Sequence, residues 1–198
     1  MASSVDFWEN RWQTGQTGWD LGAASPPLTA YADQIPLDKR ALRVLMPGCG
    51  NGYEAIHLLE CGFSKITMLD IAPTAVRRLA QRLDERAPGW ESRLQLVCGD
   101  FFDFTGVFDL ILEQTFFCAL DPARRVDYAR KMADLLEPGG RLAGVLFDRD
   151  FDGGPPFGGH AEEYRRLFRP FFRIKTMSPC YNSIPPRAGA EVFMLLER

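Results

Sequence analysis

Short apolar runs alternate along this chain with amphipathic segments of helical period. Residues 73–86 carry apolar side chains at the i, i+3, i+4, i+7 spacing of one buried helical face. Such alternation of strands and helices predicts an α/β fold with a largely parallel sheet. The expected strands are Arg43–Met46, Lys65–Asp70, Leu94–Cys98, Phe108–Leu112 and Arg141–Phe147.

The turn residues between these runs predict where helices begin and end. A helix over residues 53–60 is ended by Gly62, and Pro73 opens the helix over residues 73–86. A third helix is expected from Asp121-Pro122 to about Leu136. The last four strand runs are continuously apolar, which is typical of a sheet covered by helices on both faces.

Beyond Phe147 the pattern changes. A loop dense in Gly and Pro is followed by a short amphipathic helix, residues 161–168, and by runs at 171–176 and 191–197 that we interpret as strands closing one sheet edge. We therefore expect one domain over 1–198: a doubly wound, mostly parallel, seven-stranded Rossmann-like sheet with an antiparallel C-terminal strand. Its parts are an N-terminal segment (1–35), a core (41–147) and a C-terminal part (148–198).

Composition narrows the function classes. With 198 residues, 46% of them hydrophobic, the chain can bury a sizeable core and needs no disulfide bond or structural metal to fold. A net charge of -3 disfavours a nucleic-acid partner, and the absence of an 18-residue apolar run predicts no membrane span. The N-terminus does not resemble a signal peptide. The 5 cysteines form no C-x-x-C pair, so we expect no metal site, small buried thiols and a cytoplasmic location. A monomer is expected because the sequence shows no long exposed apolar stripe.

A ligand site is expected at the carboxyl ends of the first strands. The first strand ends in Gly48-Cys49-Gly50-Asn51-Gly52 and leads into a helix, whose free N–H groups and close backbone suit a ligand. Asp70 closes the second strand, where a carboxylate can accept hydrogen bonds from two ribose hydroxyls. Together these features predict a nucleoside-containing ligand.

The nucleoside is not specified by the glycine loop alone. The dinucleotide fingerprint G-x-G-x-x-G has Tyr53 in place of its third glycine, which disfavours NAD. Asp100, after the third strand, has two interpretations: Asp100 and Phe101 contact an adenine, or Gly99-Asp100 is a turn and the phenylalanines are core.

In this order the motifs resemble class I S-adenosylmethionine (SAM) dependent methyltransferases over Arg43–Phe147. The flanks extend the likeness, because the whole chain is similar to the thiopurine S-methyltransferase family, which includes plant thiol, thiocyanate and halide methyltransferases. The segments that carry this likeness are Phe7-Trp8-x-x-x-Trp12, Trp19-Asp20, Ala24-Ser25-Pro26, Met46–Gly50, Phe116–Ala119, Gly153–Pro156 and Ile184-Pro185-x-Arg187-x-Gly189.

The resemblance implies that SAM is the cofactor and S-adenosylhomocysteine its product. Residues 1–35 would form a lid whose tryptophans close over SAM, glycines would approach its methionine part, Asp70 would take the ribose and the residues after the third strand the adenine. The implied contacts are Trp8, Trp12, Trp19, Gly48, Gly50, Asp70, Asp100, Phe101 and Gln114.

Two of these assignments carry alternatives. The tryptophans suit a sulfonium cation, since an aromatic face attracts a cation by about 0.5–2 kcal/mol, but Val5, Trp8 and Trp12 also fit an ordinary helix stripe. Gln114 stands at a position where plant members of the family have Tyr. A glutamine can still form a hydrogen bond to the cofactor, but it cannot supply the aromatic contact of a tyrosine.

The resemblance implies methyl transfer to sulfur or another soft nucleophile: a thiol, a thiopurine-like compound, a halide or a chalcogen anion. Such acceptors need little general base, so we expect a positioning mechanism with no catalytic residue. Arg187 is the candidate for holding an anionic acceptor, with Phe116 and Phe147 as an apolar wall; a solvated Arg187 and core phenylalanines are the alternatives. We expect a structural role for His57 and regard His160 as a weaker acceptor-side candidate.

Other functions remain open from the residues alone. The alternatives are a SAM-dependent O-methyltransferase of a small molecule, a nicotinamide-dependent oxidoreductase, and a SAM-binding regulatory module without turnover. A nucleic-acid methyltransferase is disfavoured, because Arg77-Arg78 and Arg124-Arg125 lie on expected helices away from the ligand end.

Overall fold

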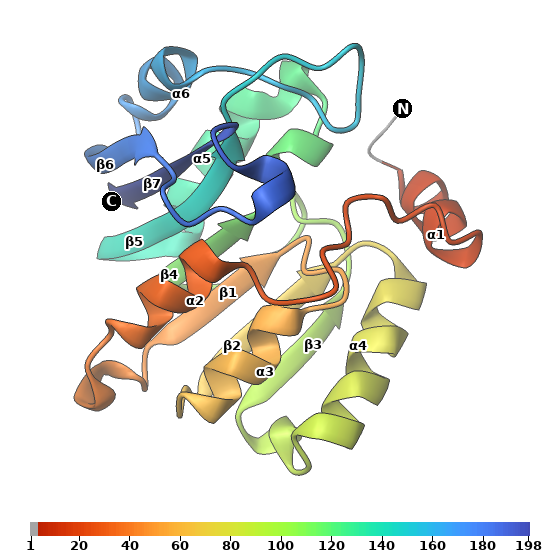
Figure 1. Cartoon of the computed structure of the whole chain (residues 1–198). Helices are drawn as coiled ribbons and strands as arrows, with labels where there is room; N and C mark the ends of the chain where they lie inside the picture. The colour runs from red at the N-terminus through yellow and green to blue at the C-terminus, as the bar shows by residue number, and fades with distance from the viewer. Residues whose placement is uncertain (1–3) are drawn as a thin grey trace.

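The apolar runs pair into one seven-stranded sheet in a computed structural model that describes residues 4–198 (Figure 1). The strand order is β3-β2-β1-β4-β5-β7-β6. The pairs among β1 to β5 are parallel, and β7 runs antiparallel between β5 and β6, which confirms the predicted sheet. The strands are β1 (Arg43–Pro47), β2 (Lys65–Asp70), β3 (Leu94–Cys98), β4 (Phe108–Gln114), β5 (Leu136–Phe147), β6 (Arg173–Pro179) and β7 (Glu191–Glu197).

Helices cover both faces of this sheet. Successive strand residues point to opposite sides, so that Leu45 belongs to one apolar cluster while Val44 and Met46 belong to the other. One cluster is completed by α5 and α6, the other by α2, α3 and α4. The helices are α1 (Val5–Gln13), α2 (Pro26–Asp33), α3 (Tyr53–Glu60), α4 (Pro73–Arg86), α5 (Arg125–Leu135) and α6 (Ala161–Phe168), with 3-10 turns at Leu37–Lys39, Trp90–Ser92, Phe117–Ala119, Pro122–Arg124 and Pro185–Arg187.

The strand after α5 begins earlier than predicted. α5 ends at Leu135, close to the predicted end, but β5 begins at Leu136, five residues before the expected start at Arg141. The reason is long-range pairing: Leu136 pairs with Phe108, while Gly139 and Gly140 exchange backbone hydrogen bonds with Arg198. Pro138-Gly139-Gly140 therefore extends a strand instead of forming a separate turn.

Helix α2 was not expected from the sequence. It begins at Pro26 after Ser25, and Pro at a first-turn position costs no hydrogen bond because that N–H has no helical partner. Its Leu28 and Ala32 are buried against the α3 side of the sheet. The buried Glu54 of α3 accepts a hydrogen bond from Ser25 N (2.9 Å), which fixes where α2 begins.

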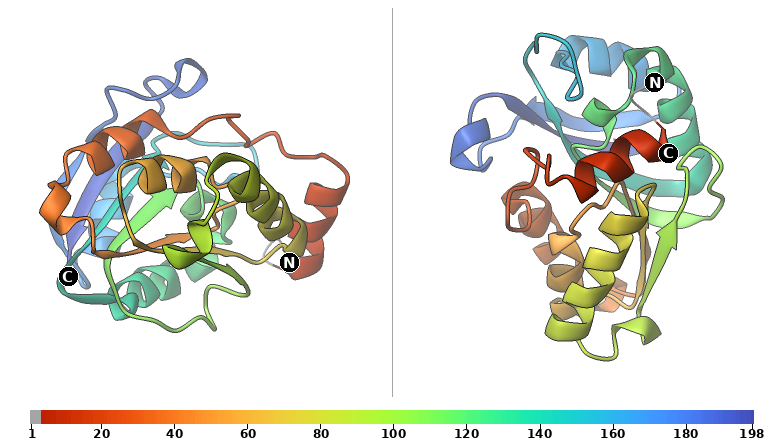
Figure 2. Two further views of the ribbon diagram at one scale, coloured as in Figure 1. Left: turned by 90° about the horizontal axis from the view of Figure 1, so that it is seen from below. Right: turned by 90° about the vertical axis from the view of Figure 1, so that its right-hand side faces the viewer.

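Residues 4–35 are the described part of the segment expected to act as a lid, and we call them the lid. They cross the edge where β1 to β4 end and place α1 beside the start of α4 (Figures 1 and 2). The expected lid was residues 1–35, of which 1–3 lie outside the described residues. Among residues 4–198, no helix is long and apolar enough to cross a membrane.

Candidate active site

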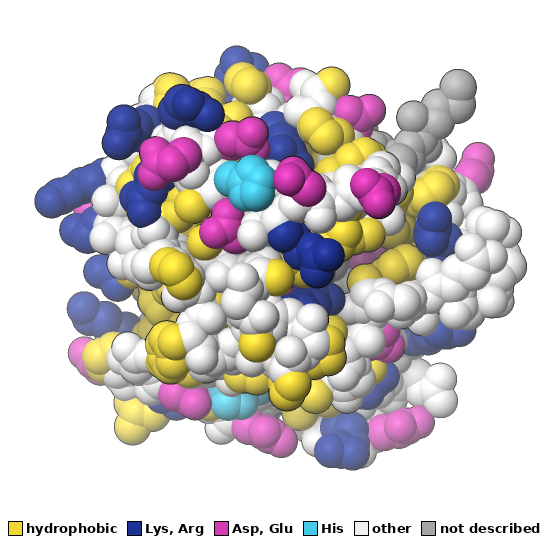
Figure 3. Space-filling view, turned by 45° about the horizontal axis from the view of Figure 1, so that its top comes forward, with side chains coloured by type: hydrophobic (Ala, Val, Ile, Leu, Met, Phe, Trp, Pro, Cys, Tyr) yellow, Lys and Arg dark blue, Asp and Glu magenta, His cyan; other side chains and the backbone are white. Residues whose placement is uncertain are grey.

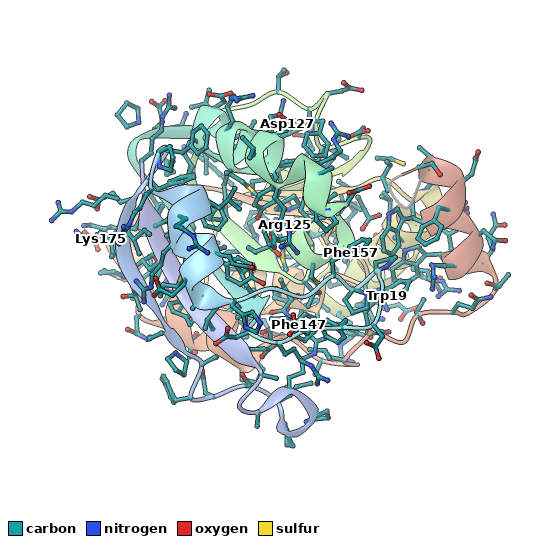
Figure 4. The ribbon with its side chains drawn as sticks, turned by 90° about the horizontal axis from the view of Figure 1, so that it is seen from above. Trp19, Arg125, Asp127, Phe147, Phe157 and Lys175 are labelled. Atoms are coloured by element: carbon teal, nitrogen blue, oxygen red, sulfur yellow. The ribbon has the colours of Figure 1, made fainter. Side chains whose placement is uncertain are left out.

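A cavity of about 480 Å³ opens at the carboxyl ends of the strands. Its lining comes from the lid, from the loops after β1 to β5 and from the turn before β7. Because the strand order reverses between β1 and β4, the cavity lies at the point where ligands bind in open α/β sheets. Seen from above, Trp19 and Phe147 point toward this region from the lid and from the end of β5 (Figure 4).

One end of the cavity, the glycine end, is defined by Gly48, Gly50, Asp70, Asp100 and Phe101. Gly48 and Gly50 have φ values of 61° and 53°, which L side chains rarely adopt. A Cβ on Gly48 would also overlap the ring of Phe116. The sequence therefore needs glycine at position 48 for both backbone conformation and space.

Asp70 is held rigidly at the glycine end. Its Oδ2 accepts a hydrogen bond from Gly50 N (2.8 Å) and its Oδ1 from Ala72 N (2.9 Å). Burial raises the pKa of this carboxyl, while the backbone N–H bonds act in the opposite direction. The residue is only 7% exposed yet lines the cavity, so the backbone N–H groups hold its carboxylate at the cavity surface.

The sequence left two interpretations open for Asp100 and Phe101, a turn with a core ring or a contact with the ligand, and their positions are compatible with both. Asp100 Oδ1 accepts a hydrogen bond from Phe102 N (2.8 Å) and closes a turn, while Phe101 is 4% exposed and packs against Phe116 and Tyr128. Both residues also line the cavity. Core packing thus fixes a ring that still presents part of its surface to the ligand space.

The three lid tryptophans form one aromatic group. Trp19 meets Trp8 and Trp12 edge to face, with ring centroids 5.4 and 5.8 Å apart. All three line the cavity, and Trp12, 3% exposed, packs against Ala72 and Ala75. The helix-stripe alternative and the lid assignment are therefore both compatible with the observed packing.

The lid is fastened at the start of α4. Glu9 accepts hydrogen bonds from Thr74 N (2.8 Å) and Thr74 Oγ1 (2.5 Å), so it satisfies one free N–H group of the first helical turn and the threonine hydroxyl. Arg78 Nη2 donates to Trp12 O (3.2 Å). Burial acts to raise the pKa of Glu9, but the bonds from Thr74 outweigh it and lower that pKa overall.

The other end of the cavity, the arginine end, is defined by Phe147, Arg149, Phe151 and Arg187. Each guanidinium lies over a ring, Arg187 over Phe147 at 5.1 Å and Arg149 over Phe151 at 4.9 Å. The two rings contact each other edge to face at 4.9 Å. This end of the cavity is therefore lined by two aromatic rings and two guanidinium cations.

The two arginines differ in their partners. Arg187 contacts Glu191 Oε1 (3.4 Å) and donates from Nη2 to Trp19 O (3.1 Å), which ties the turn before β7 to the lid. Arg149 forms no ion pair with any carboxylate of residues 4–198. Sequence reasoning named Arg187 and missed Arg149, because only the fold shows that the loop after β5 lines the cavity.

Comparison with known proteins decides the family. The family model described as Thiopurine S-methyltransferase matches residues 3–194. The chain belongs to the thiopurine S-methyltransferase family.

The similarity to individual relatives extends over most of the chain. A "Probable thiol methyltransferase 2" of Arabidopsis thaliana is 33% identical over 193 residues, covering 96% of this chain and 83% of the relative. A "Thiopurine S-methyltransferase" of Vibrio cholerae serotype O1 is 30% identical over 177 residues, covering 82% and 80%. In fold, the chain resembles the Burkholderia thailandensis 1,6-didemethyltoxoflavin-N1-methyltransferase solved with S-adenosylhomocysteine, with a TM-score of 0.75 at 20% identity over 98% of this chain and 86% of that one.

As a member of this family the protein is a SAM-dependent methyltransferase. Its glycine end fits the cofactor, because a buried carboxylate with free lone pairs stands beside two glycines whose backbone is open to the cavity. The expectation of SAM in place of NAD is confirmed.

Gln114, where the family resemblance implies Tyr in plant members, lies beside the cavity. Gln114 ends β4 and is absent from the cavity lining, and its Oε1 is buried without a hydrogen-bond partner among residues 4–198. Its neighbour Glu113 was missed by the sequence analysis. Fully buried, Glu113 accepts hydrogen bonds from Phe116 N (2.8 Å), Phe117 N (3.1 Å) and the Tyr128 hydroxyl.

Glu113 fixes the loop that forms the cavity wall. The loop passes through Thr115, whose φ of 58° is unusual for a residue with a side chain, and then carries Phe116 over Gly48. Burial raises the pKa of Glu113 to about 7, although its hydrogen bonds act to lower it. A carboxylate in a continuous apolar run was the available signal.

Several chemically notable side chains lie outside the cavity. His57 pairs with Asp33 (2.8 Å), and His160 lies near Asp148 and Asp150, at 3.3 and 3.4 Å; neither histidine is part of the lining. The expectation that all cysteines are buried is wrong for two of them, because Cys61 is partly exposed and Cys98 is exposed.

Proposed function

We propose that this protein transfers the methyl group of SAM to an anionic soft nucleophile, such as a thiolate or a halide, thiocyanate or chalcogen anion. The observation that carries the proposal is the arginine end, where two guanidinium groups stand in an otherwise aromatic wall. Such a wall suits a polarisable, weakly hydrated anion. Relatives named thiol and thiocyanate methyltransferase support the same acceptor class.

Bound SAM supplies an activated methyl group on a sulfonium cation. The chain's residues would position it: Asp70 would accept hydrogen bonds from the ribose hydroxyls, and Gly48 and Gly50 would let the backbone approach the methionine part. The lid tryptophans would offer aromatic surface to the sulfonium cation. Alignment of two reactants at about 3–3.5 Å contributes roughly 7–11 kcal/mol to lowering a barrier.

No proton has to be removed from an acceptor that is already an anion. Within the described chain, the cavity lining contains no histidine, and its carboxylates Asp70 and Asp100 stand at the glycine end. Cys118 also lines the cavity, but burial raises the pKa of its thiol, so it stays protonated at neutral pH. Positioning by Arg149 and Arg187 is therefore the chemistry proposed for the arginine end.

The test is a methyl-acceptor series with Arg149→Met and Arg187→Met. We expect each variant to raise KM for an aromatic thiol about tenfold, because a charge-assisted contact contributes about 1.5–3 kcal/mol. The Kd for S-adenosylhomocysteine should stay within twofold. Arg149→Lys and Arg187→Lys are the controls that keep the charge and should lose less.

The outcomes separate the alternatives. Methylation of phenols in preference to thiols and halides would overturn the soft-acceptor proposal and favour an O-methyltransferase. Tight S-adenosylhomocysteine binding without any methylated product would favour the regulatory module. An unchanged KM in both Met variants would remove the arginines from acceptor binding.

We further propose that the enzyme works as a cytoplasmic monomer. Support comes from five cysteines that are free in the structure. The exposed large hydrophobic residues are scattered: Val5, Leu37, Val107, Val126 and Tyr181. Figure 3 shows acidic and basic side chains interspersed on one face. Sedimentation velocity at micromolar concentration tests the monomer, which a dimer mass would overturn.

A further inference from the structure

A second group of chemically capable side chains lies away from the methyl-transfer cavity. Asp33 ends α2, His57 stands in the last turn of α3, and Cys61 follows that helix as its C-cap. His57 Nε2 is 2.8 Å from Asp33 Oδ1, Cys61 Sγ is 3.3 Å from the same oxygen, and Sγ and Nε2 are 3.5 Å apart. None of the three residues lines the cavity.

The separations approach those of a tetrahedral zinc site. With bonds of about 2.0–2.1 Å to nitrogen and about 2.3 Å to sulfur, the nitrogen–sulfur edge of a zinc tetrahedron is about 3.5 Å. The observed Sγ–Nε2 separation equals this value. The Asp33 oxygen would need to move by about half an ångström, and its side chain is 55% exposed and free to turn.

The ligand atoms are held by rigid elements. Residues 57 and 61 are one turn apart on α3, so their side chains share one face. α2 packs against α3, and Leu28 and Leu58 belong to the same buried apolar cluster. Arg40 fastens the same end of both helices, since its Nε donates to Ile35 O (3.1 Å) and its Nη1 donates to Cys61 O.

The electrostatics of the site favour a cation. Both α2 and α3 end at the cluster, so the partial negative charges of two helix C-termini converge there. Asp33 adds a full negative charge, and a second comes from Cys61 when its thiol proton leaves to solvent upon coordination. Arg40 acts in the opposite sense but is already engaged with backbone carbonyls.

We propose that Asp33, His57 and Cys61 bind one Zn²⁺ ion that joins the ends of α2 and α3. One thiolate, one imidazole and one carboxylate form a ligand set that suits zinc, with a fourth position left for water. The ion would hold α2, the last helix of the lid, against α3 and the sheet. The site is independent of the acceptor proposal, because it shares no residue with the cavity.

The experiment uses Co²⁺ as a spectroscopic substitute for Zn²⁺ on the full-length, chelator-treated protein under reducing conditions. We expect one Co²⁺ per chain, with a sulfur-to-cobalt charge-transfer band that Zn²⁺ abolishes by displacement. Cys61→Ser should remove the band, and His57→Gln and Asp33→Asn should weaken binding at least tenfold. The matched controls are Cys98→Ser, another exposed thiol, and His160→Gln, the other histidine; both should bind as the unmodified protein does.

A thermal measurement on the unmodified protein gives an answer that does not depend on the variants' folding. Zn²⁺ at a hundredfold excess over its Kd should raise Tm by several degrees, reversibly with a chelator. Absence of both the band and the Tm shift would overturn the proposal. Binding that survives in Cys61→Ser, or disappears in Cys98→Ser, would show that Co²⁺ binds elsewhere. Methyl transfer should be unchanged within twofold in Cys61→Ser.

Discussion

The two ends of the cavity are built in different ways. The glycine end is formed by backbone and by short local contacts: Gly48 and Gly50 in one turn, and Asp70 bonded to the N–H groups of Gly50 and Ala72. The arginine end is formed by side chains from separate segments, β5 with its following loop and the turn before β7.

This difference indicates which end tolerates change. A backbone-built site depends on conformations that glycine alone adopts easily, so substitutions there affect both folding and cofactor binding. A side-chain-built site can exchange residues while the sheet stays intact. Variation of acceptor on a constant cofactor site is the expected consequence.

Asp70→Asn tests the glycine end most strongly. The loss of a charged acceptor for the ribose hydroxyls should raise the Kd for S-adenosylhomocysteine about 100-fold, since each charge-assisted bond contributes about 1.5–3 kcal/mol. Isothermal titration calorimetry measures it. Asp100→Asn is the control and should cost about tenfold or less. A similar loss in both variants would show that the two carboxylates have equal roles.

Gly48→Ala tests whether the backbone at the glycine end can accommodate a side chain. The positive φ and the overlap with Phe116 together should lower the free energy of unfolding by about 2–4 kcal/mol. Gly139→Ala provides the comparison, because Gly139 also has positive φ (80°) but has no neighbouring atom within 4 Å of the added methyl group. Urea unfolding should show a loss of only about 1 kcal/mol there.

Glu113→Gln tests how Glu113 stabilises the loop between the two ends, through the pH dependence of the free energy of unfolding. The folded-state pKa of Glu113 is raised from 4.5 to about 7, so the folded protein holds this proton more strongly than the unfolded chain does. The stabilisation is therefore present below pH 4.5 and is lost as pH rises to about 7. Unfolding free energies at pH 5, 6, 7 and 8 should show the wild-type advantage over Glu113→Gln falling by at most about 1.4 kcal/mol per pH unit, then levelling. A pH-independent difference would contradict the raised pKa.

Gln114→Met should have the smallest effect. Gln114 lies outside the cavity lining and has an unpartnered buried oxygen, so an apolar side chain of similar length should leave the S-adenosylhomocysteine Kd within twofold. The free energy of unfolding should stay equal or rise slightly, because the buried polar atom is removed. A tenfold weaker Kd would place Gln114 in direct contact with the cofactor.

The sequence predicted the glycine end better than the arginine end for a physical reason. Gly48, Asp70 and Asp100 each follow a recognisable strand, and parallel strands bring their carboxyl ends to one edge. Arg149 has no such local signal, and for Glu113 the sequence shows only a carboxylate in an apolar run, because the roles of both depend on which segments the fold brings together.

The same reasoning explains where the predicted elements differ from the observed fold. β5 begins early because Leu136 pairs with Phe108, a contact that no local pattern encodes. Helix α2 is short and begins with two prolines, so its apolar face became recognisable only against α3 and the sheet.

The hydrogen bond from Arg187 to Trp19 O joins the arginine end to the lid. If Arg187 binds the acceptor as proposed, thermodynamic linkage requires that acceptor and cofactor strengthen each other's binding by the same factor. One guanidinium would then couple the two substrates within a single chain and favour an ordered ternary complex over two independent equilibria.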